Sequence, residues 1–302
     1  MGKKVLAIYY SQSGQLAEIV QQLIMPLTEA GATVEVVRIE PVPGYPFPWT
    51  TGRFYSVMPD CVLGVTGKLA PFTLKETAYD LIVLGYQAWF LYPSIPVNTL
   101  LHDPAFRQVL NNTPVVTITG ARNMWLNTFL NIKTLIHGAD SRLVGNIALA
   151  DRHPNHISFF TVLHWLKAGK KDRYLKIFPL PGVSAADIAH TSAYGKTLVP
   201  CLLKDEWSEL QKELVRQNAV YTRYSLLLLE SIAIPTYEKW ARFIVARKKR
   251  KTWLTVFRYY LLFSLFVAAP ILLTIDAALI RPFSSKRIKK KRSHYLSLNN
   301  SI

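Results

Sequence analysis

The stretch Val5-Leu6-Ala7-Ile8-Tyr9-Tyr10-Ser11-Gln12-Ser13-Gly14-Gln15-Leu16 joins a short apolar run to a turn that is rich in Ser and Gly. Such a run is typical of a central strand of a parallel sheet, because that strand is buried on both faces. Hydrophobic residues then recur at helical spacing from Leu16 to Leu27, and Gly31 stands where a helix C-cap glycine is expected. The stretch predicts a strand, a turn and a helix.

The same alternation continues along the first half of the chain. Further strands are predicted at Thr33–Ile39, Asp80–Gly85, Pro114–Thr119 and Leu143–Ala150, with helices at Val97–Leu110 and Asn123–His137 among those between them. Strands that alternate with helices are joined by right-handed crossovers. We therefore predict an α/β domain, residues 1–203, around a doubly wound five-stranded parallel sheet.

Two segments exceed this minimal plan. Residues 41–60 are rich in Pro, Gly and aromatic residues, which predicts a long loop. Loops of this length in compact domains are usually either functional lids or disordered, and the aromatic content favours an ordered loop. Residues 154–182 contain an amphipathic helix, from Ile157 to Leu166, and then a loop rich in Lys and Pro. We expect this insertion to cover either the domain or a substrate.

The C-terminal extension, residues 204–302, differs in character. A long helical region is predicted from Asp205 to Ala246, followed by the basic run Arg247–Lys251, about seventeen apolar residues from Tyr259 to Ile275, and a second basic run, Lys286–Arg292. Of the formal net charge of +17, most lies here, because Lys239–Arg292 contains fifteen Lys or Arg and one acid. The charge belongs to the tail.

A basic tail around an apolar run favours an anionic membrane surface over nucleic acid, for which no binding module is visible. Arg258, Asp276 and the central Pro270 argue against a simple span, so we expect residues 252–292 to form a monotopic hairpin or interfacial helix pair, kinked at Pro270. A single crossing, or an apolar helix packed in a core or a dimer interface, are the alternatives. The oligomeric state stays open.

The N-terminus and the cysteines indicate the compartment. Val5–Tyr10 is shorter than the apolar region of a signal peptide and no small-residue cleavage site follows it. Cys61 and Cys201 lie far apart, so neither a disulfide framework nor a structural metal site is encoded. We expect a cytoplasmic protein that is peripheral or monotopic at the inner membrane.

The Ser-rich turn suits a phosphate monoester. Where a strand ends and a helix begins, backbone N–H groups and the helix dipole converge on an anion. Ser11 and Ser13 add hydroxyl donors, and Gly14 lets the backbone approach closely. The nucleoside-triphosphatase loop and the G-x-G-x-x-G pattern are both missing from the turn. The alternative interpretation is a simple Ser-rich helix N-cap.

Two more loops follow predicted strands. Tyr86-Gln87-Ala88-Trp89-Phe90 supplies large aromatic rings that suit a planar ligand, although such residues are more often packing. Gly120-Ala121-Arg122-Asn123 opens a helix and places a guanidinium at the same edge of the sheet. Three strand-end loops at corresponding positions are more specific than any one of them.

With these three loops, YYSQSGQ, LGYQAWF and TITGAR, residues 1 to 200 resemble the flavodoxin and NAD(P)H:quinone-reductase superfamily. The resemblance implies a flavodoxin-like fold that binds FMN. Phosphate contacts are expected from Ser11, Gln12, Ser13, Gly14, Gln15 and Leu16, where flavodoxins often place Thr at the last position, and ring contacts from Tyr86, Gln87, Ala88, Trp89, Phe90, Gly120, Ala121, Arg122 and Asn123.

More closely, KKVLAIYYSQSGQL, the PFPWT loop and the basic, apolar extension resemble the bacterial dialkylresorcinol-condensing enzymes. That resemblance implies an aromatase that oxidises a dialkyl cyclohexane-1,3-dione, made by a ketosynthase and an acyl carrier protein, to a 2,5-dialkylresorcinol of the flexirubin type. A hydrophobic substrate agrees with a membrane-associating tail. The alternatives are an NAD(P)H-dependent flavin quinone or diketone reductase, a membrane-anchored flavodoxin-like electron carrier, and a binding protein with an inactive flavin site.

The predicted reaction needs a general base. Our first choice is His153, because Asp151-Arg152-His153 follows the last predicted strand, at the edge where open α/β sheets bind ligands. Tyr86 is the second catalytic candidate, and His156, His164, Tyr45 and Tyr55 are further alternatives. A lone histidine is more often structural than catalytic.

Overall fold

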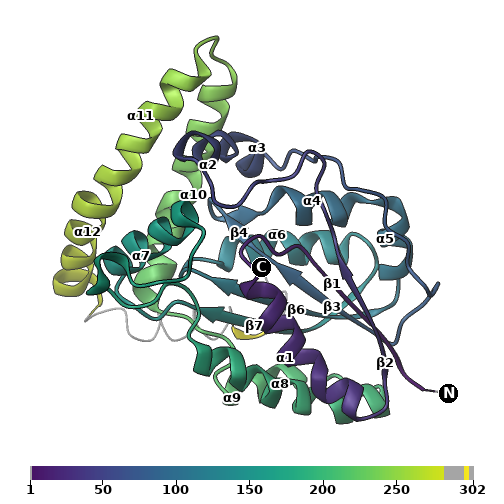
Figure 1. The fold of residues 1–302 in the computed structure, drawn as a ribbon. Coiled ribbons are helices and arrows are strands. Elements are labelled where there is room, and N and C mark those ends of the chain that lie inside the picture. Colours follow the sequence, from purple (N-terminus) through teal and green to yellow (C-terminus); the bar gives the residue numbers. More distant parts are fainter. Residues whose placement is uncertain (1, 282–295, 299–302) are drawn as a thin grey trace.

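The computed structural model of the chain describes residues 2–281 and 296–298. Its centre is a five-stranded sheet formed by β1 (Lys4–Tyr9), β2 (Thr33–Arg38), β3 (Leu81–Tyr86), β6 (Pro114–Ala121) and β7 (Arg142–Ala150). The strands lie in the order β2-β1-β3-β6-β7 and every neighbouring pair is parallel (Figure 1). This is the strand order of the flavodoxin-like fold, which confirms the predicted fold class.

Helices cover both faces of the sheet and divide the core in two. Residues of β1 alternate between these halves: Leu6 and Ile8 pack toward α4 (Ile95–His102), α5 (Pro104–Leu110) and α6 (Leu126–His137). Val5 and Ala7 pack on the other face, toward α1 (Gln15–Glu29), α8 (Ala185–Lys204) and α9 (Leu210–Arg216). With both faces covered, the carboxyl edge of the sheet is free to form a site.

Two predicted helices differ in their bounds. The helix expected over Val97–Leu110 is two helices, because Asp103 ends α4 and caps α5, its Oδ1 accepting a hydrogen bond from Phe106 N at 2.9 Å. Pro104 then stands at the start of α5, where its missing N–H costs nothing. The helix expected from Asn123 begins only at Leu126, since residues 123–125 form a loop.

The predicted long ordered loop at 41–60 is partly helical. It contains α2 (Thr51–Ser56), and α3 (Met58–Val62) follows directly. Thr50 caps α2 by accepting a hydrogen bond from Arg53 N at 3.2 Å. After β3, the short strands β4 (Ala88–Trp89) and β5 (Tyr92–Pro93) form an antiparallel hairpin that packs beside this segment. The helix predicted within the 154–182 insertion is α7 (Asn155–Ala168), followed by the turn η1 (Tyr174–Lys176).

The single helical region expected from Asp205 to Ala246 is wrong. After α9, residues 217–223 are not helical, and Val220 forms a parallel bridge to Ala148 of β7. The helix α10 (Tyr224–Val245) then begins. This segment packs on the sheet, while the division of the chain at residue 203 stays a prediction.

The kink predicted at Pro270 is also wrong. The helix continues through α11 (Arg250–Phe263), η2 (Ser264–Ala268), α12 (Ala269–Ile275) and η3 (Asp276–Ile280), and the chain reverses earlier, between α10 and α11 (Figure 1). The π-helical turn η2 directly precedes Pro270 and accommodates the proline within the helix. We call α10 and the Arg250–Ile280 helix the tail hairpin. The basic run Lys286–Arg292 lies outside the described residues.

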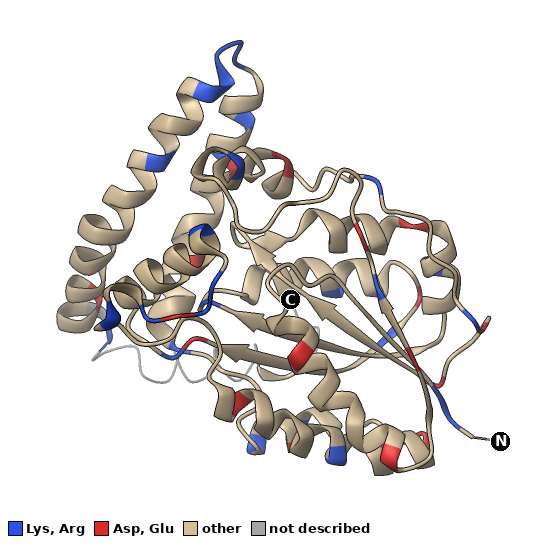
Figure 2. Ribbon diagram, in the orientation of Figure 1, with Lys and Arg blue, Asp and Glu red and all other residues tan. Residues whose placement is uncertain are grey.

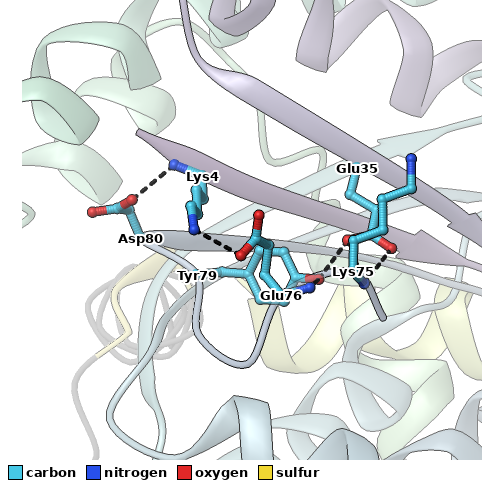
Figure 3. A network of polar contacts seen from close by, with 6 residues as sticks. All are labelled: Lys4, Glu35, Lys75, Glu76, Tyr79 and Asp80. Atoms are coloured by element: carbon cyan, nitrogen blue, oxygen red, sulfur yellow. Dashed lines mark hydrogen bonds and ion pairs between the residues drawn. The ribbon is translucent and has the colours of Figure 1, made fainter. Parts of the chain in front are cut away.

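Polar contacts join the strands near their amino-terminal ends, opposite to the carboxyl edge of the sheet (Figure 3). Glu35 on β2 accepts hydrogen bonds from Lys75 N at 3.1 Å and from the Tyr79 hydroxyl at 2.5 Å. Asp80, which precedes β3, accepts from Lys4 N at 2.7 Å. These bonds join β1, β2 and the approach to β3 at their amino-terminal ends, away from the edge where ligands bind.

Candidate functional site

A cavity of about 410 Å³ lies at the carboxyl edge of the sheet. Because β1, β3 and β6 are neighbours, the loops that follow them meet there. The predicted residues that line it are Gln12, Ser13, Gln87, Ala88, Trp89, Phe90, Gly120, Ala121, Arg122 and Asn123. The structure therefore brings parts of all three predicted loops into one cavity.

The first loop combines the two functions considered for it. The Ser11 hydroxyl accepts a hydrogen bond from Ala17 N at 3.3 Å and so satisfies an N–H group in the first turn of α1, although the N-cap residue is Gly14 and not a Ser. Gly14 adopts a left-handed conformation, with φ of 88°, and turns the chain into the helix. The N–H groups of Gln15 and Leu16, at the helix start, have no acceptor within the helix. Those groups remain suited to an anion.

Gln15 and Leu16 do not direct their side chains at the cavity. The Gln15 amide donates to Val183 O at 3.3 Å and accepts from Val183 N at 3.1 Å, so it fixes the loop before α8. Leu16 is buried in the core beneath α1. Side-chain contacts of these two residues with a phosphate, which the resemblance implied, therefore reduce to contacts of their backbone.

Three side chains with unpaired polar atoms lie in one part of the cavity lining. Gln12 Nε2, Gln87 Oε1 and Asn123 Oδ1 are buried and have no hydrogen-bond partner among the described residues. One comes from each strand-end loop, and all three side chains line the cavity. Buried polar atoms without partners are costly, so this arrangement fits a ligand that has hydrogen-bonding edges.

Aromatic side chains form one wall. The Trp89 ring lies edge-on to Tyr45 and Trp49, with centroid distances of 5.0 and 5.3 Å, and Tyr45 stacks on Trp49 at 5.9 Å. Phe90 contacts Phe54 at 5.0 Å. The aromatic loop thus packs directly on the second strand-end loop, and Trp49 and Phe54 join the cavity lining.

The hairpin that carries Phe90 is strained. Phe90 and Leu91 both have positive φ, 49° and 70°, in the two-residue connection between β4 and β5. Such turns prefer Asn-Gly, because side chains disfavour the left-handed region. Strain of this kind is held in place by surrounding contacts and concentrates at functional sites. Here the contacts of Phe90 with Phe54 and Tyr55 hold the turn in place beside the cavity.

The wall facing the strand edge is apolar; the sequence indicated that the insertion containing α7 covers the domain or a substrate, but the part that the tail hairpin contributes was missed. It combines residues of α7 with residues of the tail hairpin: Phe159, Val162, Leu163, Leu166, Leu229, Ile232, Ala233, Tyr260, Leu261, Leu265, Ala268, Ala269 and Leu272. The sequence favours membrane association for the apolar run, with packing in a core only as an alternative. The helical spacing of the run is visible, but which face meets the sheet domain depends on the turn at 246–249.

Neither predicted catalytic residue faces the cavity. Tyr86 is fully buried in the core under α4 and α6, its hydroxyl has no partner among the described residues, and burial raises its pKa well above the ordinary value. His153 is exposed, because Asp151 turns inward and accepts from His153 N at 2.9 Å. We therefore withdraw both as the general base.

The two histidines among the other candidates for the base, His156 and His164, also lie outside the cavity lining. The ring of His164 contacts Asp172 Oδ1 at 2.8 Å outside the cavity, and the ring of His156 lies beside Phe266. The lining, which consists of described residues, contains no His, Asp or Glu. Tyr237 and Tyr260 line the cavity, and burial raises the pKa of Tyr237. The cavity therefore offers phenols rather than a strong base.

Comparison with known proteins assigns the chain to no family. No family model and no curated protein matches the chain. Among solved structures, it is similar to a flavoprotein in complex with FMN from Lactobacillus acidophilus, at 19% identity over 50% of this chain and 95% of that one, with a TM-score of 0.41.

A flavodoxin from the domain Archaea covers 66% of this chain and 99% of its own, at 10% identity and a TM-score of 0.37. A flavone reductase covers 68% of this chain and 65% of its own, at 12% identity and a TM-score of 0.37. At such identities and TM-scores, the assignment of the fold rests on strand order and on the flanking helices. The chain has a flavodoxin-like sheet domain with a helical tail that covers the carboxyl edge of the sheet.

Proposed function

We propose that the protein is an FMN-dependent oxidoreductase that acts on a hydrophobic substrate at a membrane surface. The observation that carries the proposal is one cavity with two unlike walls. Strand-end loops supply unpaired polar atoms on one side, and the tail hairpin and α7 supply apolar side chains on the other. A polar, planar cofactor and an alkyl-bearing substrate would each find a matching surface.

The residues present fit FMN. Backbone N–H groups at the start of α1, together with Ser13, would hold the phosphate, as helix N-termini commonly do. Gln12, Gln87 and Asn123 would pair with the polar edges of the ring system, and Trp89 would lie against its face. Bound there, FMN supplies a two-electron acceptor that takes a hydride at its N5.

For the reaction, the oxidation of a dialkyl cyclohexane-1,3-dione to a 2,5-dialkylresorcinol agrees best with the site. The conversion removes two hydrogens: a proton, which the acidic 1,3-dione gives up to water as its enolate forms, and a hydride, which bound FMN would accept, with oxygen or a carrier as the final electron acceptor. A cyclic 1,3-dione is acidic enough to enter the cavity as its enolate, so a cavity without His or carboxylate suffices. The apolar wall would exclude water and hold the alkyl chains.

The tail hairpin supports attachment to a membrane. Arg250–Leu279 is the helix, among the described residues, that is long and apolar enough to span one. While one side of it lines the cavity, large apolar side chains outside the cavity lining stay exposed along it, namely Val256, Tyr259, Phe263, Val267, Ile271, Ile275 and Leu279. We propose that these side chains enter the cytoplasmic leaflet of the inner membrane, where a dialkylated substrate dissolves. Supply of the dione by a ketosynthase and an acyl carrier protein stays a prediction.

An anaerobic absorption experiment tests the reaction. The purified, FMN-loaded full chain is mixed with a dialkylcyclohexane-1,3-dione, and we expect the flavin absorption to bleach and to recover in air, with one resorcinol formed per flavin reduced. Fast bleaching by NADPH alone would instead assign the reductase, and a flavin that only exchanges electrons with protein partners would assign the carrier. A protein that binds no FMN would overturn the whole proposal.

A further inference from the structure

Arg122 is the charged side chain among those that line the cavity. It follows β6, and its Nη1 donates to Asn155 O at 3.2 Å and to Asn155 Oδ1 at 3.1 Å, at the start of α7. Both acceptors are neutral. No carboxylate within the described part of the chain forms an ion pair with this guanidinium.

The surroundings compensate the charge only in part. The carboxylate of Asp151 favours the cation from a distance without forming an ion pair with it, and its oxygens accept hydrogen bonds from His153 N at 2.9 Å and from Gly182 N at 3.2 Å. Burial lowers the pKa of Arg122, which means that its position disfavours the positive charge. Arg122 is half-buried, and a cation that is partly removed from water and has no charged partner is costly unless an anion completes the site.

The remaining donors of Arg122 are available to a ligand. A guanidinium has five N–H donors in a planar fork, and only Nη1 has partners among the residues that the structure describes. Around it stand apolar side chains of α7 and of the tail hairpin, with the Tyr237 phenol close enough to influence its charge. A cation at one end of an apolar cavity selects a ligand with one anionic oxygen and an alkyl body.

The phosphate of FMN is not the natural partner. The phosphate turn follows β1, whereas Arg122 follows β6, two positions away in the sheet. Neighbouring strands are about 4.8 Å apart, so the two strand ends are separated by about 10 Å. The bonds to Asn155 also hold the guanidinium toward α7 and not toward α1.

We infer that Arg122 binds the anionic oxygen of an acidic amphiphile, such as the enolate of an alkylated 1,3-dione or a long-chain carboxylate, whose alkyl chain lies between α7 and the tail hairpin. The inference deepens the proposed function, because it assigns the ionised substrate as the bound form. It rests on the cavity of that proposal and does not require flavin turnover.

Binding of a matched pair of probes tests the inference. The FMN-loaded full chain, in a non-ionic detergent, is titrated with dodecanoate and with dodecan-1-ol below their aggregation concentrations. We expect dodecanoate to bind about tenfold more tightly or better, since charge-assisted hydrogen bonds exceed neutral ones. Arg122→Gln should remove that preference and leave the affinity for the alcohol unchanged. Arg122→Lys, which keeps the charge, should retain part of it.

Arg53→Gln is the matched control, because Arg53 is exposed and stacks on Tyr45 outside the cavity lining. The inference is overturned if the Arg122→Gln variant keeps the preference for dodecanoate, whether or not it still binds FMN. Lost preference together with a flavin that no dione bleaches would uphold the ligand class and reject only the proposed reaction. Circular dichroism spectra and FMN affinity report whether the variant folds.

Discussion

Gly14 has the backbone conformation that a side chain tolerates least at the entry to the proposed phosphate site. Its φ is 88° and its ψ is −28°, although a Cβ added there would meet no atom within 4 Å. The constraint is therefore conformational and not steric.

We expect Gly14→Ala to destabilise the fold by about 1 kcal/mol and to weaken FMN binding, because the turn must relax and move its N–H groups. Gly52→Ala is the control, since Gly52 lies within α2 at ordinary φ and also has free space around it. Thermal unfolding and flavin titration measure the two effects. Equal behaviour of the two variants would contradict a special conformation at Gly14.

Single residues also show what the sequence could predict about the site. Ile82, Leu84 and Tyr86 pack on the same side of the sheet, so strict alternation along β3 would have placed Tyr86 in the core rather than in the cavity. His153 offered no such signal, because the side chain of Asp151 decides which way the loop after β7 turns. The strand-end loops were predictable because parallel strands bring their carboxyl ends together.

At the scale of elements, Glu230 joins the tail hairpin to the sheet domain. It lies on α10 and is buried, and its Oε1 accepts a hydrogen bond from Asn127 N at 2.7 Å, at the start of α6. Burial raises the pKa of this carboxyl from 4.5 to about 7, against the lowering effect of the N–H donors. The ionised carboxylate of Glu230 caps the helix α6, whereas the protonated carboxyl has the lower free-energy cost of burial.

A pH dependence of stability follows from this shift. Since the folded pKa exceeds the unfolded one, the contribution of Glu230 is fully present below pH 4.5 and is lost as the pH rises through about 7. The loss is at most about 3 kcal/mol. We expect the Tm of the Glu230→Gln variant to rise relative to the Tm of the parent protein when the pH is raised from 5 to 8. A difference that does not vary with pH would refute the assignment.

The elements of the tail were the least predictable part of the fold. The five strands follow from local apolar runs, whereas the break between α9 and α10 depends on the bridge from Val220 to Ala148, which is distant in sequence. Pro270 suggested a kink, but a π-helical turn beside it keeps the helix continuous. Pairing partners and helix register are tertiary properties that a single sequence does not display.

For the whole molecule, the tail hairpin determines both the closure of the cavity and the exposed apolar surface. Phe266 packs on Phe159 and Phe160 of α7, with centroid distances of 5.6 and 5.3 Å, while Phe263 is 59% exposed. The same helix thus has a side that meets the sheet domain and a side free for lipid. Basic residues gather where α10 turns into α11, at the tip of the hairpin (Figure 2).

The charge at this tip should strengthen binding to anionic lipid. Lys248, Lys249 and Lys251 are exposed, and each Lys near an anionic surface contributes about 1 kcal/mol, so replacing all three by Gln should weaken binding to phosphatidylglycerol vesicles by about 100-fold. Co-sedimentation measures the change, and binding to purely zwitterionic vesicles should stay the same.

The control for this triple variant replaces Lys196, Lys204 and Lys212, which are exposed on α8 and α9, with the same loss of net charge. Because surface potential falls off within about 10 Å at moderate salt, only charges held next to the lipid contribute. Equal weakening by both triples would mean that overall charge, and not the hairpin tip, draws the protein to the membrane. A selective loss at the tip would instead place the turn between α10 and α11 next to the anionic surface.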